Sequence, residues 1–128
     1  MSNIFIFTNG GKKSQRELTE DITAWFINTK LPRFKNLNLE IDLEKIDDVQ
    51  GYCVKYDNRT FHIGIDKRLQ GDDFVTCVFH ELTHVEQHLR NKFGINDDND
   101  DIHYLDRPYE IDAYIKQEQL LEEYRLCS

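Results

Sequence analysis

The longest apolar pattern in the chain predicts a helix over about positions 72–93. Apolar residues recur there at spacings of three and four, which is the period of one buried helical face. They are Val75, Val78, Leu82, Val85, Leu89 and Phe93. We expect the N-cap in the turn Gly71-Asp72-Asp73 and the end of the helix at Gly94.

Two further helices are predicted at either end of the chain. Ser14-x-x-Glu17 has the spacing of a capping box and Pro32 follows the pattern, so the first of these helices should run from Ser14 to about Asn28. Pro108 is suited to the first turn of a helix, so we expect the last helix to begin there.

Four segments have the pattern of strands. The first is Asn3–Phe7, and it ends before Asn9-Gly10-Gly11. Positions 37–43 alternate apolar and acidic or amide residues, which is typical of a strand with one buried face. Positions 52–56 and 60–65 form a predicted hairpin. We expect the strand at 60–65 to be an open edge beside the long helix, with His62 and Gly64 on the face opposite Phe61, Ile63 and Ile65.

The order of these elements predicts an α+β fold. We expect a small twisted antiparallel or mixed sheet of three to four strands, packed on an N-terminal helix, the helix at 72–93 and a C-terminal ligand helix. The length of 128 residues, 39% hydrophobic and 31% charged, predicts one domain over positions 1–128 with a core that needs no disulfide.

His80-Glu81-Leu82-Thr83-His84 is the stretch that points to chemistry. On a helix, residues four apart share a face, so both imidazoles could bind one Zn²⁺ while Glu81 acts as a general base on water. The alternative is a helix that happens to carry two surface histidines. The predicted helix and the position of both histidines opposite the apolar face favour the metal site.

A zinc site needs a third protein ligand, and the residues offer several. His88 lies about 6 Å farther along the helix axis than His84, so it is a poor ligand for the same ion. His103 lies in an acidic loop. Glu110 and Asp112 follow Pro108 near the start of the last helix, on different faces of it.

His80-Glu81-x-x-His84 followed by Glu110-x-x-Ala113 resembles the gluzincins, and most closely the minimal gluzincins and the short bacterial and phage domains of this kind. The resemblance covers about positions 50–118. It implies that His80, His84 and Glu110 bind Zn²⁺ and that Glu81 is the general base of a zinc-dependent peptidase. Asp112 would then be a residue behind the ligands. The missing His-x-x-Gly-x-x-His extension argues against the metzincins.

The expected reaction is hydrolysis of a peptide or protein substrate. His103 and Tyr104 are equal candidates for stabilising the oxyanion, and the acidic residues at 96–101 would favour basic substrates if they line the cleft. The alternatives are a zinc-stabilised binding module without turnover and a latent peptidase whose cleft is filled by its own chain.

Net charge and cysteine content limit the binding partners and the cellular compartment that we expect. A net charge of −8 argues against nucleic-acid binding, and no apolar stretch is long enough to cross a membrane. The odd number of cysteines, Cys53, Cys77 and Cys127, predicts free thiols in a reducing compartment. We therefore expect the cytoplasm of a bacterium or of a phage-infected cell.

Overall fold

A mixed four-stranded sheet lies against three helices. The computed structural model describes residues 3–127. The elements in chain order are β1 (Asn3–Gly10), α1 (Lys13–Lys30), β2 (Asn36–Glu44), β3 (Gly51–Asp57), β4 (Thr60–Asp66), α2 (Gly71–Arg90), the 3₁₀ turn η1 (Tyr104–Asp106) and α3 (Pro108–Cys127). The predicted α+β class and the predicted order of strands and helices are confirmed.

The strands are ordered β1-β2-β4-β3 across the sheet. β1, β2 and β4 are parallel, and β3 runs antiparallel to β4. The expectation that β4 is an edge strand is therefore wrong, because β2 pairs with one side of it and β3 with the other. The edge strand beside α2 is β3, and the opposite edge is β1.

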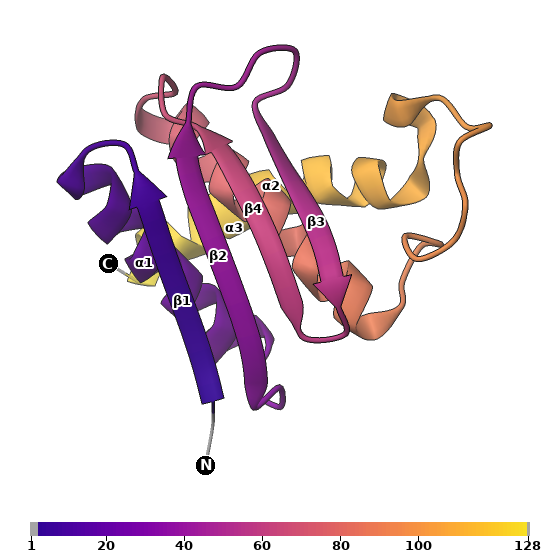
Figure 1. The fold of residues 1–128 in the computed structure, drawn as a ribbon, viewed down its shortest axis with the longest axis horizontal. Coiled ribbons are helices and arrows are strands. Elements are labelled where there is room, and N and C mark those ends of the chain that lie inside the picture. The colour runs from indigo at the N-terminus through magenta and orange to yellow at the C-terminus, as the bar shows by residue number, and fades with distance from the viewer. Residues whose placement is uncertain (1–2, 128) are drawn as a thin grey trace.

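One face of the sheet is covered by helices and the other is open, as Figure 1 shows. Alternation assigns the side chains: those of Leu39 and Ile41 on β2 and of Ile63 on β4 are buried toward the helices. Their neighbours Glu40, Asp42 and His62 therefore lie on the open face. His62 and Gly64 share this face, as predicted, and the ring of Tyr52 lies so close to Gly64 that a Cβ there would come within 2.1 Å of it.

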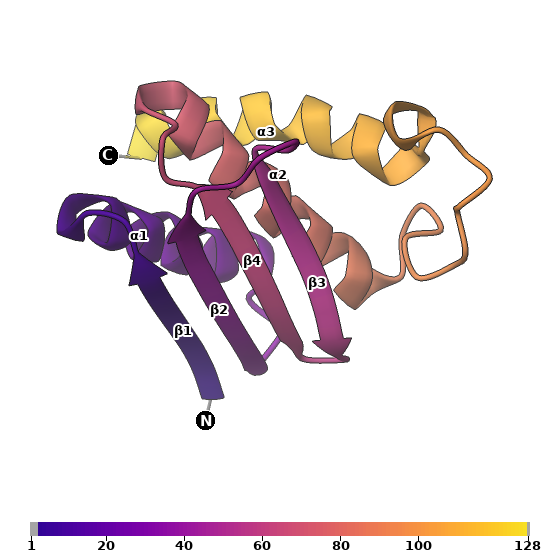
Figure 2. The same ribbon diagram turned by 45° about the horizontal axis from the view of Figure 1, so that its top comes forward.

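The layers continue beyond the sheet. Figure 2 shows α1 and α2 next to the sheet and α3 crossing α2 on the side away from it. α2 is therefore buried on two sides: Leu82 and Val85 lie in the core, and the histidine face lies under α3. The partly buried Cys53 and the buried Cys77 are free thiols within these layers, as the sequence predicts, and Cys127 is an exposed free thiol.

The N-cap of the first helix lies two residues before the predicted one, at Lys12 rather than Ser14. The amide of Lys12 donates to the Gln15 side-chain oxygen at 2.9 Å, which makes Lys12 the N-cap. Ser14 consequently lies inside the first turn, and the capping box with Glu17 is wrong. The helix ends at Lys30, just before Leu31 and Pro32, so the predicted stop is close to the observed one.

α2 also differs from its prediction at both ends. Gln70, rather than the turn Gly71-Asp72-Asp73, is the N-cap, although Asp72 and Asp73 do lie in the first turn. The helix ends at Arg90 because Asn91 takes the left-handed conformation with φ 51°. Phe93 is therefore outside the helix and 44% exposed, and the stop at Gly94 is wrong.

Candidate metal centre

α2 and α3 form the site by facing each other with polar side chains. His80 and His84 lie one turn apart on α2, and each is only 6% exposed because α3 covers them. Glu110 lies in the first turn of α3 and is 2% exposed. Ala113, one turn further on, is fully buried, and its small side chain lets the two helices approach closely.

The three side chains converge at one point. Glu110 Oε1 lies 3.0 Å from His80 Nε2 and 2.7 Å from His84 Nε2. The two imidazole rings are 4.8 Å apart and nearly perpendicular. Among the described residues this is the buried group whose donor atoms could hold a metal ion, and it joins the two predicted histidines to the predicted glutamate.

The outer nitrogen of each imidazole is held by a glutamine. His84 Nδ1 lies 2.8 Å from Gln87 Oε1, and His80 Nδ1 lies 2.8 Å from Gln117 Oε1. The Gln87 amide can have only this orientation, because its Nε2 donates to the Tyr109 carbonyl and to Asp112 Oδ2, each at 2.9 Å. The amide oxygen accepts, so each Nδ1 carries a proton, and Nε2 is the nitrogen of each ring that faces Glu110.

With both rings in their neutral form, two lone pairs and a carboxylate oxygen would face one another in a buried space. Three acceptors at such distances repel unless a cation or a shared proton lies between them. The set of two imidazoles and one carboxylate is the one that catalytic Zn²⁺ takes, leaving a fourth position open. The residues present fit a zinc ion.

Charges in this space respond to one another. Burial alone would raise the pKa of the Glu110 carboxyl. The hydrogen bonds with His80 and His84 outweigh it and hold this pKa well below its usual range. Burial likewise works against protonation of His84, but the hydrogen bond to Glu110 and the charge of Glu81 leave its pKa raised. Both shifts show that the site favours positive charge beside Glu110.

Glu81 lies next to the three converging side chains without joining them. Its side chain is 5% exposed, and burial raises the pKa of its carboxyl to about 7. Gly51 at the start of β3 leaves room for it, since a Cβ at this position would come within 3.1 Å of Glu81 Oε2. A carboxylate with a pKa near neutrality is suited to general acid–base work.

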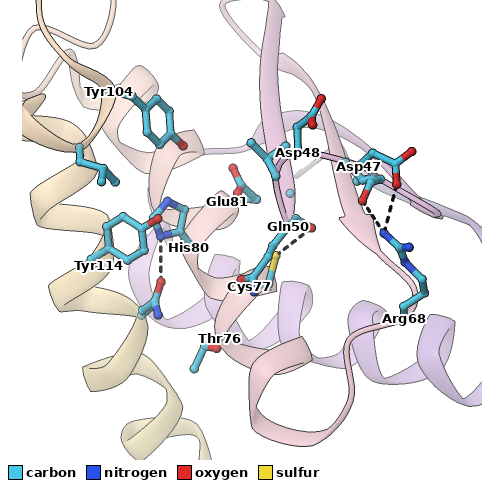
Figure 3. Close-up of a pocket in the computed structure, with 15 residues that line it drawn as sticks. Asp47, Asp48, Gln50, Arg68, Thr76, Cys77, His80, Glu81, Tyr104 and Tyr114 are labelled. Carbon is cyan, nitrogen blue, oxygen red and sulfur yellow. Dashed lines mark hydrogen bonds and ion pairs between the residues drawn. The ribbon is translucent and has the colours of Figure 1, made fainter.

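Two clefts meet at Glu81. The main cleft, of about 620 Å³, is drawn in Figure 3 and is lined by His80 and Glu81, by Tyr104 and Tyr114, and by the loop 46–51 between β2 and β3. The side cleft, of about 290 Å³, runs along the first residues of β3 past His84 and Glu110. The edge strand β3 thus borders the candidate site.

Of the two oxyanion candidates, only Tyr104 lies in the clefts. Burial and the nearby Glu110 carboxylate raise the pKa of its phenol. His103 is exposed, and its Nδ1 accepts the Leu105 amide at the start of η1. Tyr114 is a further phenol of the main cleft, with its ring 4.6 Å from that of His80.

The remaining ligand candidates lie outside the converging group. Asp112 accepts a hydrogen bond from Gln87 and pairs with Lys116 at 3.4 Å, so it lies behind His84 rather than beside Glu110. His88 bonds Asn96 through Nδ1 at 2.6 Å and packs against Phe61. Neither side chain belongs to the group that could hold a metal.

Sequence reasoning missed part of the cleft. Of the acidic residues in the lining, Asp47 and Asp48 come from the β2–β3 loop, while residues 96–101 line neither cleft. Arg68 also reaches the main cleft, where it pairs with Asp66 at 2.7 Å. The role of Gln117 had a signal, because it lies seven residues after Glu110 and so on the same helical face. No pattern in the sequence indicated that the β2–β3 loop lines the main cleft.

Comparisons with known proteins add no relative: no family model, no curated protein and no solved structure matches the chain. Within residues 3–127, none of the helices combines the length and the apolar character needed to span a membrane.

Proposed function

We propose that the protein is a zinc-dependent peptidase of the gluzincin type. The observation that carries the proposal is the convergence of His80 Nε2, His84 Nε2 and Glu110 Oε1, three atoms that could bind one metal ion together. His80, His84 and Glu110 would hold the ion. Gln87 and Gln117 would fix the orientation and tautomer of the two imidazoles.

Zinc bound here would polarise the scissile carbonyl and lower the pKa of a water molecule toward about 7. Glu81 is the general base in this proposal. Its carboxyl lies beside the ligands without being one of them, and its raised pKa allows it to take a proton from water and return it to the leaving amine. The phenol of Tyr104, or that of Tyr114, would donate a hydrogen bond to the oxyanion.

The substrate would be an extended peptide placed along β3. The outer edge of this strand has no neighbouring strand in the sheet, and its first residues line the side cleft next to Glu81. A peptide added there would gain main-chain hydrogen bonds whatever its side chains are. The sequence expectation of an edge beside α2 is thus retained in the proposal, with β3 in place of β4.

A latent peptidase is the second candidate. Tyr104 lines both clefts and lies beside Glu110 in the side cleft, so the segment before α3 reaches the proposed ligands from the cleft side. A peptidase in this form would need that segment to move before a substrate could enter. The location in the cytoplasm stays a prediction, which the free thiols support.

The test is a comparison of the wild type with Glu81→Gln. The variant keeps the shape of the side chain and all three ligands, so we expect unchanged zinc content and a loss of peptidase activity of about 10²-fold or more. Zinc is measured by elemental analysis and cleavage with a peptide library. Equal cleavage by both proteins would contradict the mechanism. Zinc binding without cleavage by the wild type would favour the binding module or the latent form.

A further inference from the structure

A second group of donor side chains lies on the open face of the sheet. Glu40 and Asp42 are two residues apart on β2, and both project from the face that no helix covers. His62 on β4 lies directly across from Glu40 in the parallel register. One donor atom from each of the three lies within 4.8 Å of the other two.

The closest contact in the group joins unlike donors. His62 Nε2 lies 2.7 Å from Asp42 Oδ2, and the two side chains are 19% and 25% exposed. Two ligands at right angles on one first-row metal ion, with bonds of about 2.1 Å, lie about 3 Å apart. An ion could therefore take the place of the proton between these atoms with only a small movement of either side chain.

Both of these side chains are held from behind. His62 Nδ1 lies 3.1 Å from the Tyr56 hydroxyl on β3, and Asp42 Oδ1 accepts a hydrogen bond from the Asn9 amide on β1 at 3.2 Å. These contacts leave Nε2 and Oδ2 directed at each other. The buried site has the same arrangement, in which the outer nitrogen of each histidine is engaged and Nε2 meets a carboxylate. Partners of this kind orient metal ligands.

We propose that Glu40, Asp42 and His62 form a second, surface site for a divalent transition-metal ion. One imidazole and two carboxylates suit Zn²⁺, Co²⁺ or Mn²⁺, whereas Mg²⁺ and Ca²⁺ take oxygen ligands alone. Three protein ligands leave the outward positions to water, because no helix covers this face. Binding uses the lone pair of His62 Nε2, so the ring carries its proton on Nδ1, where the Tyr56 hydroxyl can accept it. The site lies across the sheet from the buried one and does not depend on it.

The experiment is a titration of the metal-free protein with Co²⁺, followed by amide NMR. We expect two sets of changes, one at α2 and α3 and a second at residues 40, 42 and 62. His62→Ala and Asp42→Asn should weaken the second set by about 10-fold or more. The matched control is Glu44→Gln, which removes the same charge from the same face of β2 but leaves the three donors in place; its affinity should stay within about 2-fold of the wild type.

The proposal fails if Co²⁺ leaves residues 40, 42 and 62 of the wild type unchanged, or if His62→Ala and Glu44→Gln bind equally. All the substituted side chains are at the surface, so circular dichroism should show folded proteins. Glu40→Gln is a second variant, expected to weaken the same set of changes, should Asp42→Asn disturb the contact with Asn9.

Discussion

The two imidazoles of α2 are the residues on which metal binding should depend most. His80→Ala or His84→Ala removes one of the proposed ligands and leaves Glu110 buried beside the remaining ring. We expect each variant to lose its zinc and to unfold at lower temperature, because a bound ion stabilises only the folded state. Zinc analysis after dialysis and thermal unfolding measure both effects. His88→Ala is the matched control and should keep its zinc; loss of zinc from the control alone would contradict the site.

Glu110 and Asp112 should differ sharply in their effect on zinc affinity. Glu110 Oε1 faces both imidazoles, whereas Asp112 acts only through Gln87. Glu110→Ala should weaken zinc binding by far more than Asp112→Ala, for which about 10-fold fits the loss of a partner behind the ligands. Competition with a chelator measures both affinities. The reverse ranking would assign the third ligand to Asp112.

Glu81 should make the stability of the metal-free protein depend on pH. Burial raises its pKa from 4.5 in the unfolded chain to about 7 in the fold, so the folded form holds more protons between these values. The protonated Glu81 carboxyl therefore adds to the free energy of unfolding below about pH 4.5, and this contribution is lost as the pH rises through about 7. Its size is on the order of 3 kcal/mol. Urea unfolding at several pH values measures it. Glu81→Gln should make the free energy of unfolding less dependent on pH between about 4.5 and 7. An identical pH dependence in both proteins would be evidence against this role of Glu81.

What the sequence could predict at this scale is set by local geometry. His80, Glu81 and His84 follow from spacing on one helix, and that spacing survives in any fold that keeps the helix. The positions of Tyr104 and Asp48 depend on how two loops meet over α2, which no periodicity encodes. The choice between His103 and Tyr104 had to wait for the fold for the same reason.

α3 is held to the rest of the protein in two different ways along its length. Its first half carries Glu110 and Gln117, which contact the histidines, and its second half carries Tyr124, whose ring packs 5.4 Å from Trp25 and 5.8 Å from Phe79. Removal of the metal should therefore loosen the first half more than the second. Amide hydrogen exchange should become about 10-fold faster over 110–117 and change little over 119–126. Equal acceleration along the helix would mean that α3 opens as one unit.

At the scale of elements, the sequence predicted the strands and α-helices of residues 3–127 in order, but it missed the 3₁₀ turn η1 and was wrong about the end of α2 and the place of β4. The end of α2 depends on Asn91 in the left-handed conformation, which competes with the predicted stop at Gly94. The place of β4 in the sheet depends on parallel pairing with β2 across a long separation in sequence. Alternation assigns the faces of a strand and says nothing about its neighbours.

For the whole molecule, the sheet divides two environments. The helix side contains the buried core and the candidate zinc centre, and the open side contains His62 with its carboxylate partners. The hydrophobic pattern predicted the buried face of α2, and the spacing of His80 and His84 predicted the candidate metal centre on its other face. Alternation also placed His62 on the open face, but it did not predict that Glu40 and Asp42 lie beside it, because alternation does not say which strand is the neighbour.

The outer edge of the sheet has a consequence for behaviour in solution. β1 contains no charged residue, its outer edge has no strand beside it in the sheet, and Phe5 and Phe7 are 49% and 58% exposed on the open face. An uncharged apolar edge strand can pair with the same strand of another molecule. The net charge of −8 makes the molecules repel one another, but salt screens this repulsion. Light scattering at rising salt should therefore show self-association that Phe7→Lys suppresses and Ile115→Lys, an exposed site on α3, does not. Equal suppression by both variants would mean that the added charge alone prevents self-association. Suppression by Phe7→Lys alone would mean that the colloidal stability of the protein depends on β1.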